Sequence, residues 1–210
     1  MFITLEGIEG SGKSTLISQL YARLRNQGRS VLCTREPGGS ALGTQLRPLL
    51  LTEGQKLDPH AELFLFLADR AQHLAEVIRP ALAAGVWVLC DRYADSTIAY
   101  QGYGRGMDPE ELQRLNEVAI SGLWPDITLL LDLSAQEGLR RALARNELLS
   151  RSQTEGRFEA EDPAFHERVR QGFLHRAALS PRRFRILDAT LPPEKLADQA
   201  LTILHAAIRE

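Results

Sequence analysis

The chain has 210 residues, of which 44% are hydrophobic and 25% are charged, and its formal net charge is −2 at pH 7. These values are ordinary for a globular protein and predict a single domain over residues 1–210. The charge balance gives no global basic field, so we expect no nucleic-acid partner. The longest apolar stretch, residues 81–90, is too short to cross a bilayer, and the N-terminus lacks a signal-peptide pattern. We therefore expect no membrane partner and a cytoplasmic location.

The basic residues comprise three lysines and twenty-two arginines. A guanidinium binds phosphate with two parallel hydrogen bonds, which suits a phosphate-handling protein, although compositional bias explains most of the arginines.

The two cysteines, Cys33 and Cys90, lie in apolar strand-like runs and are expected to be buried, reduced thiols. No spacing of Cys and His residues indicates a metal site.

A strand is predicted at residues 2–6 and a helix at 13–27, and the segment between them matches the phosphate-binding P-loop pattern G-x-x-x-x-G-K-[S/T]. The glycines let backbone N–H groups surround phosphate oxygens, and the helix N-terminus adds positive potential. Lys13 would reach the β- and γ-phosphates of ATP, and Ser14 would ligate Mg²⁺. The alternative is a glycine-rich turn that matches by chance. The predicted ATP-binding residues are Gly7, Ile8, Glu9, Gly10, Ser11, Gly12, Lys13, Ser14 and Thr15.

The second strand, expected at 30–34, leads into Thr34-Arg35-Glu36-Pro37-Gly38-Gly39. An arginine beside a Gly-Gly turn at a strand end is a candidate anion site, and the alternative is a turn with an unrelated arginine. Helices are predicted at 41–51 and 58–84. In the longer one, Phe66 and Arg70 lie one turn apart on the same face, where they could stack on a base and hydrogen-bond its edge. Taken alone, an aromatic residue such as Phe66 is more often a core residue.

The third strand, expected at 86–90, is followed by Asp91-Arg92-Tyr93. An aspartate at the end of an apolar strand resembles the Walker B position, where a carboxylate acts on Mg²⁺ directly or through water. A strand-ending aspartate paired with Arg92 is the alternative. The segment that follows holds Ser96, Thr97, Tyr100 and Gln101.

The remaining elements continue the alternation of strands and helices. An Arg-rich polar segment, about 140–162, has the composition of a mobile lid and equally that of a solvated loop. Alternating apolar strands and helices predict an α/β fold with a mostly parallel sheet, whose ligands gather at the carboxyl ends of the strands. The further predicted elements are strands at 127–133 and 184–188 and helices at 110–122, 135–149, 162–179 and 193–209.

P-loops serve many functions, so the motif alone indicates only nucleotide binding. The chain has neither the N-K-x-D guanine-reading motif of GTPases nor an ABC-type signature. The short length and the late Arg-rich segment favour a small kinase. The order and spacing of the motifs together resemble the thymidylate kinase family over nearly the whole chain. The resemblance rests on residues 2–7 with the P-loop, 34–39, Phe66 with Arg70, 91–93 with Ser96 and 99–102, and 186–190.

The resemblance implies a P-loop nucleoside-monophosphate kinase fold, with a five-stranded parallel sheet flanked by helices and a mobile lid. It implies phosphorylation of dTMP to dTDP with ATP and Mg²⁺ by in-line phosphoryl transfer, which supplies dTTP for DNA synthesis. Because the attacking phosphate oxygen is already anionic, the reaction needs no general base. It also implies a homodimer, which the several apolar sides of helix 58–84 would suit.

The resemblance also implies roles for individual residues. Arg35, Arg92 and, less securely, Arg47 would hold the dTMP phosphate, and Ser96 belongs to the same motif. Phe66 would stack on thymine, Arg70 would donate to its O4, and Thr97 and Gln101 would contact the pyrimidine edge. Glu9 would approach the 3′-hydroxyl and Tyr100 the 2′ side of the sugar. Ser14 and Asp91 are the candidate metal ligands.

The family divides by the origin of one arginine, which comes either from the P-loop or from the lid. This P-loop has no basic residue among Ile8, Glu9, Gly10 and Ser11, so the chain resembles the lid-arginine type. Arg145 and Arg141 are the candidates for transition-state contacts, with Lys13, Arg92 and Glu9 as the other catalytic candidates. Leu143 stands where some relatives carry a further arginine, and Arg151 and Arg157 stay as alternatives. Other interpretations of the whole chain are a kinase for another acceptor, a nucleotide-binding regulator or P-loop ATPase, and a degenerate P-loop protein without catalysis.

Overall fold

The structure is a computed structural model, and it describes residues 1–148 and 156–208. Five parallel strands form one sheet in the order β2-β3-β1-β4-β5. All five predicted strands are confirmed, each within one residue at either end. They are β1 (Phe2–Glu6), β2 (Val31–Arg35), β3 (Trp87–Asp91), β4 (Ile127–Asp132) and β5 (Phe184–Asp188).

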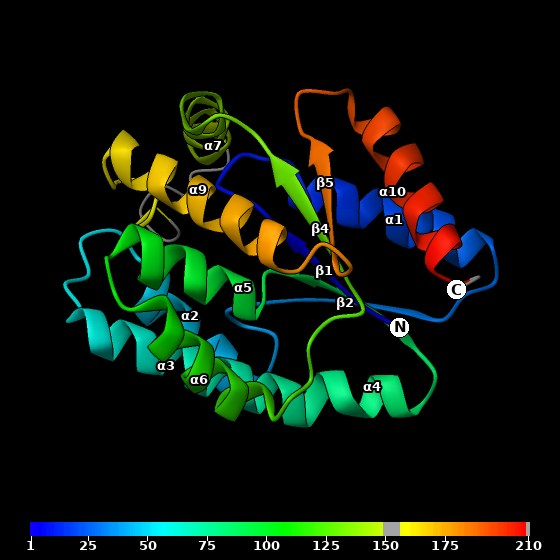
Figure 1. Ribbon diagram of the computed structural model, residues 1–210, viewed down its shortest axis with the longest axis horizontal. Helices are drawn as coiled ribbons and strands as arrows, with labels where there is room; N and C mark the ends of the chain where they lie inside the picture. Colours follow the sequence, from blue (N-terminus) through cyan, green and yellow to red (C-terminus); the bar gives the residue numbers. More distant parts are fainter. Residues whose placement is uncertain (149–155, 209–210) are drawn as a thin grey trace.

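Helices cover both faces of the sheet (Figure 1). On one face lie α1 (Lys13–Asn26) and α10 (Pro193–Ala207), and on the other lie most helices of the middle of the chain. This is the predicted α/β architecture. The middle helices are α2 (Ala41–Leu51), α3 (Pro59–His73), η1 (Leu74–Ile78), α4 (Arg79–Ala83), α5 (Ala94–Thr97), η2 (Ile98–Gly104), α6 (Pro109–Ile120), α7 (Ala135–Leu148) and α9 (Pro163–Leu179).

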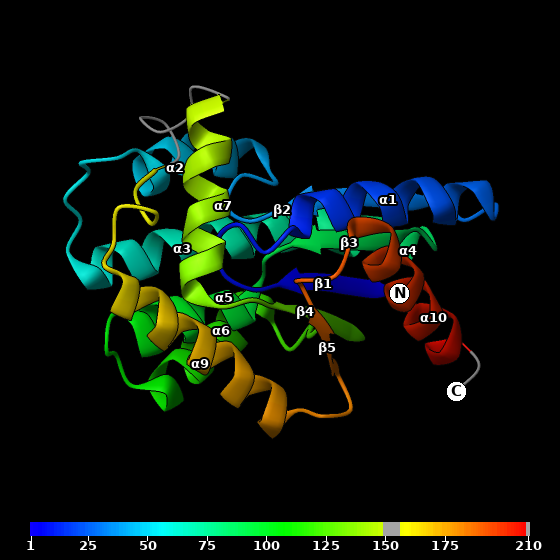
Figure 2. The same cartoon turned by 90° about the horizontal axis from the view of Figure 1, so that it is seen from above.

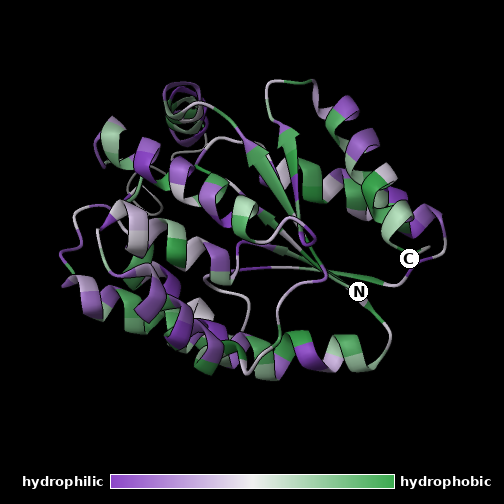
Figure 3. Ribbon diagram, viewed as in Figure 1, coloured by the Kyte–Doolittle hydropathy of each residue, from purple (hydrophilic) through white to green (hydrophobic). Residues whose placement is uncertain are grey.

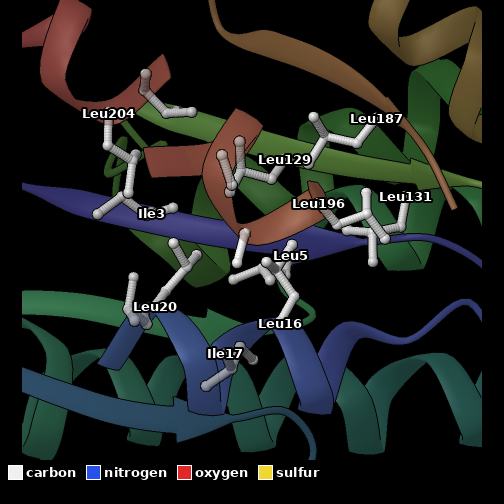
Figure 4. Packing of buried hydrophobic residues seen from close by; sticks show 14 of the residues in the cluster. Ile3, Leu5, Leu16, Ile17, Leu20, Leu129, Leu131, Leu187, Leu196 and Leu204 are labelled. Carbon is white, nitrogen blue, oxygen red and sulfur yellow. The ribbon is translucent and has the colours of Figure 1, made fainter. Parts of the chain in front are cut away.

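The core follows from the alternation of side chains along the strands. Ile3 and Leu5 of β1 point to the face with α1 and α10, where they meet Leu16, Leu20 and Leu204 (Figure 4). Phe2 points to the opposite face and packs among Ile78, Val88 and Ile120. Because the central strands are buried on both faces, they read as continuous apolar runs, and Figure 3 shows them as mostly hydrophobic ribbons inside mixed helices.

The helix expected at 58–84 differs from the observed one in its middle. Asp58 caps its start by accepting a hydrogen bond from His60 N, with Pro59 in the first turn, and Gly85 follows its end with φ of 73°. Between α3 and α4, however, residues Leu74–Ile78 form a π-helical segment, η1. Such a segment widens the turn and changes which side chains face the sheet.

The helical segment over residues 94–104 was not predicted. The residues of α5 and η2 include β-branched side chains and two glycines, which have low helix propensity. Packing against α9 explains the helix. A Cβ atom on Gly104 would lie 2.6 Å from the Phe165 ring, so a glycine is required where the two helices touch.

The expectation for Cys33 was wrong. Cys90 is buried in the central strand β3, but Cys33 is exposed, because its strand β2 is at the edge of the sheet and is covered only in part. No helix in the described part of the chain is both long and apolar enough to cross a bilayer.

Candidate active site

The carboxyl ends of the five strands meet at one edge of the sheet, and a cavity of about 830 Å³ lies there. The strand order reverses on either side of β1, so the loop after β1 lies at the position where parallel α/β sheets bind ligands. Most of the predicted site residues line this cavity. They are Glu9, Gly10, Ser11, Gly12, Lys13, Ser14, Thr15, Arg35, Arg47, Phe66, Arg70, Asp91, Arg92, Ser96, Thr97, Tyr100, Gln101, Arg141 and Arg145. Gly7 and Ile8 do not line it.

The P-loop lysine is buried and fully hydrogen-bonded. Lys13 Nζ donates to Gly7 O and Ile8 O, both at 2.9 Å, and to Ser11 Oγ at 3.3 Å. Gly7 and Ile8 therefore serve through their carbonyl groups, which hold the lysine over the loop. Burial, together with the nearby Arg92 guanidinium, lowers the pKa of Lys13 to about 8.

The candidate metal position lies between α1 and the end of β3. Ser14 Oγ donates to Asp91 Oδ2 at 3.2 Å, and Asp91 Oδ1 is buried without a hydrogen-bond partner among the described residues. A hydroxyl beside an unsatisfied carboxylate oxygen fits Mg²⁺, which takes few protein ligands when it is bound with a nucleotide. In residues 1–148 and 156–208, no three His, Cys, Asp or Glu side chains gather as a metal site of their own.

Glu9 ties the P-loop to the neighbouring elements. Its Oε1 accepts hydrogen bonds from Arg92 at 2.8 Å and from the Tyr100 hydroxyl at 2.5 Å, and its Oε2 lies 3.3 Å from His166 Nδ1. Burial alone would raise the pKa of Glu9, but Arg92, His166 and Lys13 outweigh it and hold this pKa well below its usual range. Glu9 is therefore a buried carboxylate inside a cationic pocket.

Arg92 is held in an unusual backbone conformation. Its φ of 69° lies in the left-handed region, which a long side chain rarely adopts. The conformation is fixed on three sides, because the Arg92 N–H donates to Leu5 O, the guanidinium donates to Gly7 O, and its plane covers the Tyr100 ring at 4.9 Å. Strain of this kind persists where the surroundings fix it and is typical of functional sites.

At the far end of the cavity, Arg70 is fully buried, and almost all N–H groups of its guanidinium donate hydrogen bonds to other residues. Its guanidinium donates to Glu36 Oε2 (2.8 Å), Thr97 Oγ1 (2.7 Å), Asn116 Oδ1 (2.7 Å) and Tyr93 O (3.1 Å). A guanidinium has five N–H groups, so these contacts with described residues leave one N–H, on Nη2, for a ligand. Glu36, from the loop after β2, thus orients Arg70.

The aromatic side chains near Arg70 form one wall of the cavity. Phe66 lies one helical turn before Arg70, and both residues face the cavity as the spacing predicts. The Phe66 ring lies 6.2 Å from the ring of Phe158, and Tyr100 packs edge-on against Phe158 at 5.2 Å. Arg35 and Arg47 line the same end, and Arg47 donates to Pro37 O at 2.6 Å.

Helix α7 carries two arginines across the carboxyl ends of the strands (Figure 2). Arg141 and Arg145 are four residues apart, so both lie on the face of α7 that lines the cavity. The helix approaches the P-loop closely because glycines meet there. A Cβ atom on Gly138 would lie 2.6 Å from Glu9 O, and one on Gly10 would lie 2.0 Å from Gly138 O.

Of the two alternative lid arginines, the structure describes Arg157. Arg157 is buried and donates to Leu50 O, Gln55 O and Glu62, and it does not line the cavity. Arg151 lies outside the described residues, as do 149–155 of the lid expected over 140–162. Arg145 instead contacts Asn146 Oδ1 at 2.9 Å and Glu159 Oε1 at 3.2 Å.

Several residues of the site were not found from the sequence. The loop after β5 lines the P-loop end of the cavity with Ala189, Thr190, Leu191, Pro192 and Pro193, and only its resemblance motif at 186–190 pointed to it. Glu6 is fully buried behind Ser96, and burial together with Asp95 raises its pKa to about 8. His166 belongs to no spacing pattern, and the motif at residues 2–7 includes Glu6 without indicating its partners, so no local signal could have identified their contacts.

The cavity joins a P-loop to a second pocket with aromatic and cationic side chains, under a helix that carries arginines, and this combination is typical of P-loop nucleoside-monophosphate kinases. Comparison with known proteins agrees. The family model described as thymidylate kinase matches residues 5–200, and the chain belongs to the thymidylate kinase family. It is 56% identical to the thymidylate kinase of Nitratidesulfovibrio vulgaris strain DSM 19637 / Miyazaki F, over 99% of this chain and 97% of that protein. It is 58% identical to that of Oleidesulfovibrio alaskensis, over 95% of this chain and 94% of that protein.

The buried environment of Lys13 predicts a pH dependence. The pKa of Lys13 is about 8, so the side chain is charged below pH 8 and loses its proton as the pH rises through this value. Since the charge is needed to bind phosphate, kcat/KM for ATP should fall about tenfold per pH unit above pH 8. Initial rates between pH 6 and 10 measure this profile. The exposed Lys56 is the control, and Lys56→Ala should leave the profile unchanged. A wild-type profile that is flat to pH 10 would contradict the assignment.

Proposed function

We infer that the chain is an ATP-dependent dTMP kinase, which phosphorylates dTMP to dTDP and supplies dTTP for DNA synthesis. The family match over residues 5–200 supports this function. The observation that carries it in the structure is the single cavity that joins the P-loop to the pocket of Phe66 and Arg70. A phosphate donor at the first end and an acceptor nucleotide at the second would meet beside Arg92.

ATP is the phosphoryl donor, and we propose that its phosphates lie in the P-loop under Lys13. Ser14 and Asp91 would hold Mg²⁺, which neutralises charge on the transferring phosphates. The loop 189–193 and Leu196 would cover the base of ATP, because these largely apolar residues line that end of the cavity.

We propose that dTMP lies at the other end, with thymine against Phe66 and its O4 at the remaining N–H of Arg70. Thr97 and Gln101 would face the pyrimidine edge, and Tyr100 and Glu9 would face the sugar. Arg35, Arg47 and Arg92 would hold the phosphate, with Ser96 beside Arg92. The roles are supported by the lining of one cavity, which brings together a planar aromatic side chain, a guanidinium that can donate to a base edge, and several cations that suit a phosphate.

Catalysis in this proposal is positioning and charge neutralisation. The attacking phosphate oxygen of dTMP is anionic, so no residue has to remove a proton. The chain's task is to bring two polyanions together, and Lys13, Arg92, Arg141 and Arg145 supply the compensating charge in a largely buried site. We further propose that 140–162 acts as a lid on a single domain over 1–210, with α7 as its base.

The acceptor is tested by release of ADP from ATP and Mg²⁺ with dTMP, dUMP, UMP, dCMP, AMP, GMP or thymidine offered separately. We expect strong turnover with dTMP, weaker turnover with dUMP, little with the others, and loss of turnover when Mg²⁺ is chelated. Turnover with a different preferred acceptor would contradict the pocket, and ADP release that ignores every acceptor would contradict the kinase function.

Arg145→Ala tests the role of the α7 arginines. We expect kcat to fall by about 10³-fold, by analogy with arginine fingers, while Kd for dTMP changes little, because in this proposal Arg145 contacts the transferring phosphate and not the base. Single-turnover rates and equilibrium titration separate the two quantities. Arg140→Ala is the matched control, since Arg140 is on the same helix and contacts only Glu137 among the side chains described. Near-normal kcat in Arg145→Ala would overturn the assignment.

We propose that the chain forms a homodimer through the outer side of α2 and α3. Leu49 of α2 and Phe64 of α3 expose 48% and 57% of their surface, and the two helices pack side by side. A second copy would cover these side chains. Light scattering should give twice the chain mass for wild type and the monomer mass for Phe64→Asp, whereas a monomeric wild type would contradict the dimer.

We also propose a cytoplasmic location, which cell fractionation tests.

A further inference from the structure

Behind the base end of the cavity lies a carboxylate that the kinase mechanism does not use. Glu62 of α3 is 1% exposed and does not line the cavity. Its Oε1 accepts a hydrogen bond from Gln101 Nε2 at 2.8 Å. Two guanidinium groups complete its contacts, since Arg105 donates to both oxygens at 3.2 and 3.3 Å and Arg157 donates to Oε2 at 2.5 Å.

These contacts determine the orientation of the Gln101 side chain. A carboxylate between two guanidinium groups offers acceptors only, so the amide of Gln101 must turn its NH₂ group toward Glu62. Its carbonyl oxygen then lies on the other side. Gln101 lines the cavity, and no described residue donates a hydrogen bond to its Oε1. The side of the amide left for a ligand is therefore an acceptor.

An acceptor at this position distinguishes pyrimidine bases by chemistry. Thymine and uracil carry a hydrogen-bond donor at N3, whereas N3 of cytosine is an acceptor. A polar pocket that is matched to one partner rejects an analogue that leaves its buried groups unpaired. We propose that Glu62 is a specificity-determining positioning residue, which fixes the Gln101 amide so that the pocket selects bases with an N–H at position 3. This inference rests on the base pocket proposed above.

Glu62 also joins the pocket to the segment that closes it. Arg157 immediately precedes Phe158 and Glu159, which line the cavity, and Arg105 pairs with Glu161 at 2.5 Å. The same carboxylate thus holds the Gln101 amide and the backbone around Phe158. Both carboxylate oxygens of Glu62 are needed to neutralise the two buried arginines. The orientation of the carboxylate toward Gln101 is therefore fixed.

Glu62→Gln tests the proposal with a change of one atom. Arg105 and Arg157 both donate to the Oε2 position, so the carbonyl oxygen of the new amide will stay there. Its NH₂ group will then face Gln101. The Gln101 amide will rotate so that its carbonyl oxygen accepts from this NH₂ group and its own NH₂ group faces the cavity. We expect the ratio of kcat/KM for dTMP over dCMP to fall at least tenfold, since a matched hydrogen bond becomes a mismatched one. Arg70 still faces position 4, so dTMP should remain the better substrate.

Glu161→Gln is the matched control. It removes a carboxylate charge from the same Arg105 but does not touch Gln101, so the ratio of kcat/KM for the two substrates should stay at the wild-type value. If Glu62 were only structural, Glu62→Gln would lower the melting temperature and slow both substrates equally, with the ratio unchanged. That result would overturn the proposal.

A double-mutant cycle separates Glu62 from Gln101. In Gln101→Met the amide is gone, so adding Glu62→Gln should leave the dTMP to dCMP ratio as it is in Gln101→Met alone. A further fall in the ratio would contradict action through Gln101. If either variant folds poorly, Kd for dTMP and dCMP measured on the folded fraction gives the same ratio. A wild-type enzyme without preference for dTMP over dCMP would instead refute the base pocket itself.

Discussion

The ion pair between Glu9 and Arg92 connects the parts of this site. Glu9 belongs to the loop after β1, Arg92 follows β3, and the pair lies 2.8 Å apart beside Tyr100 and His166. It joins the P-loop to the segment after β3, although these segments are more than eighty residues apart in the chain. The pair also leaves Arg92 in a strained backbone conformation that points its guanidinium into the cavity.

The wider constraint is electrostatic. In the proposed function the cavity receives two phosphate groups and therefore needs many cations, and without compensation buried cations would destabilise the fold. The structure provides the compensation with buried carboxylates, since Glu9 faces Arg92, Glu36 faces Arg70, and Glu62 faces Arg105 and Arg157. Each carboxylate also orients the group it neutralises. We therefore propose that the same charges stabilise the free protein and position its ligand contacts.

The sequence predicted the parts of the site that lie within one segment. The P-loop, the Phe66 and Arg70 spacing and the strand ends are local patterns with a direct physical meaning, so the strands and most of the cavity lining follow from them. The pairing of Glu62 with Gln101 and of Glu9 with His166 joins residues 39 and 157 positions apart in the sequence. Such contacts depend on how elements distant in the sequence pack together, which no local pattern records. The exposure of Cys33 escaped prediction for the same reason, because it depends on the place of β2 at the sheet edge.

The most direct test is a crystal structure of the complex with dTMP, Mg²⁺ and a non-hydrolysable ATP analogue. The account predicts the analogue's terminal phosphorus within about 3.5 Å of a dTMP phosphate oxygen, in line with the bond to be broken, with thymine on Phe66 and its N3 at Gln101 Oε1. Arg92 and Arg145 would both contact the phosphates. A complex in which dTMP binds outside this cavity, or with its base toward the P-loop, would contradict the account.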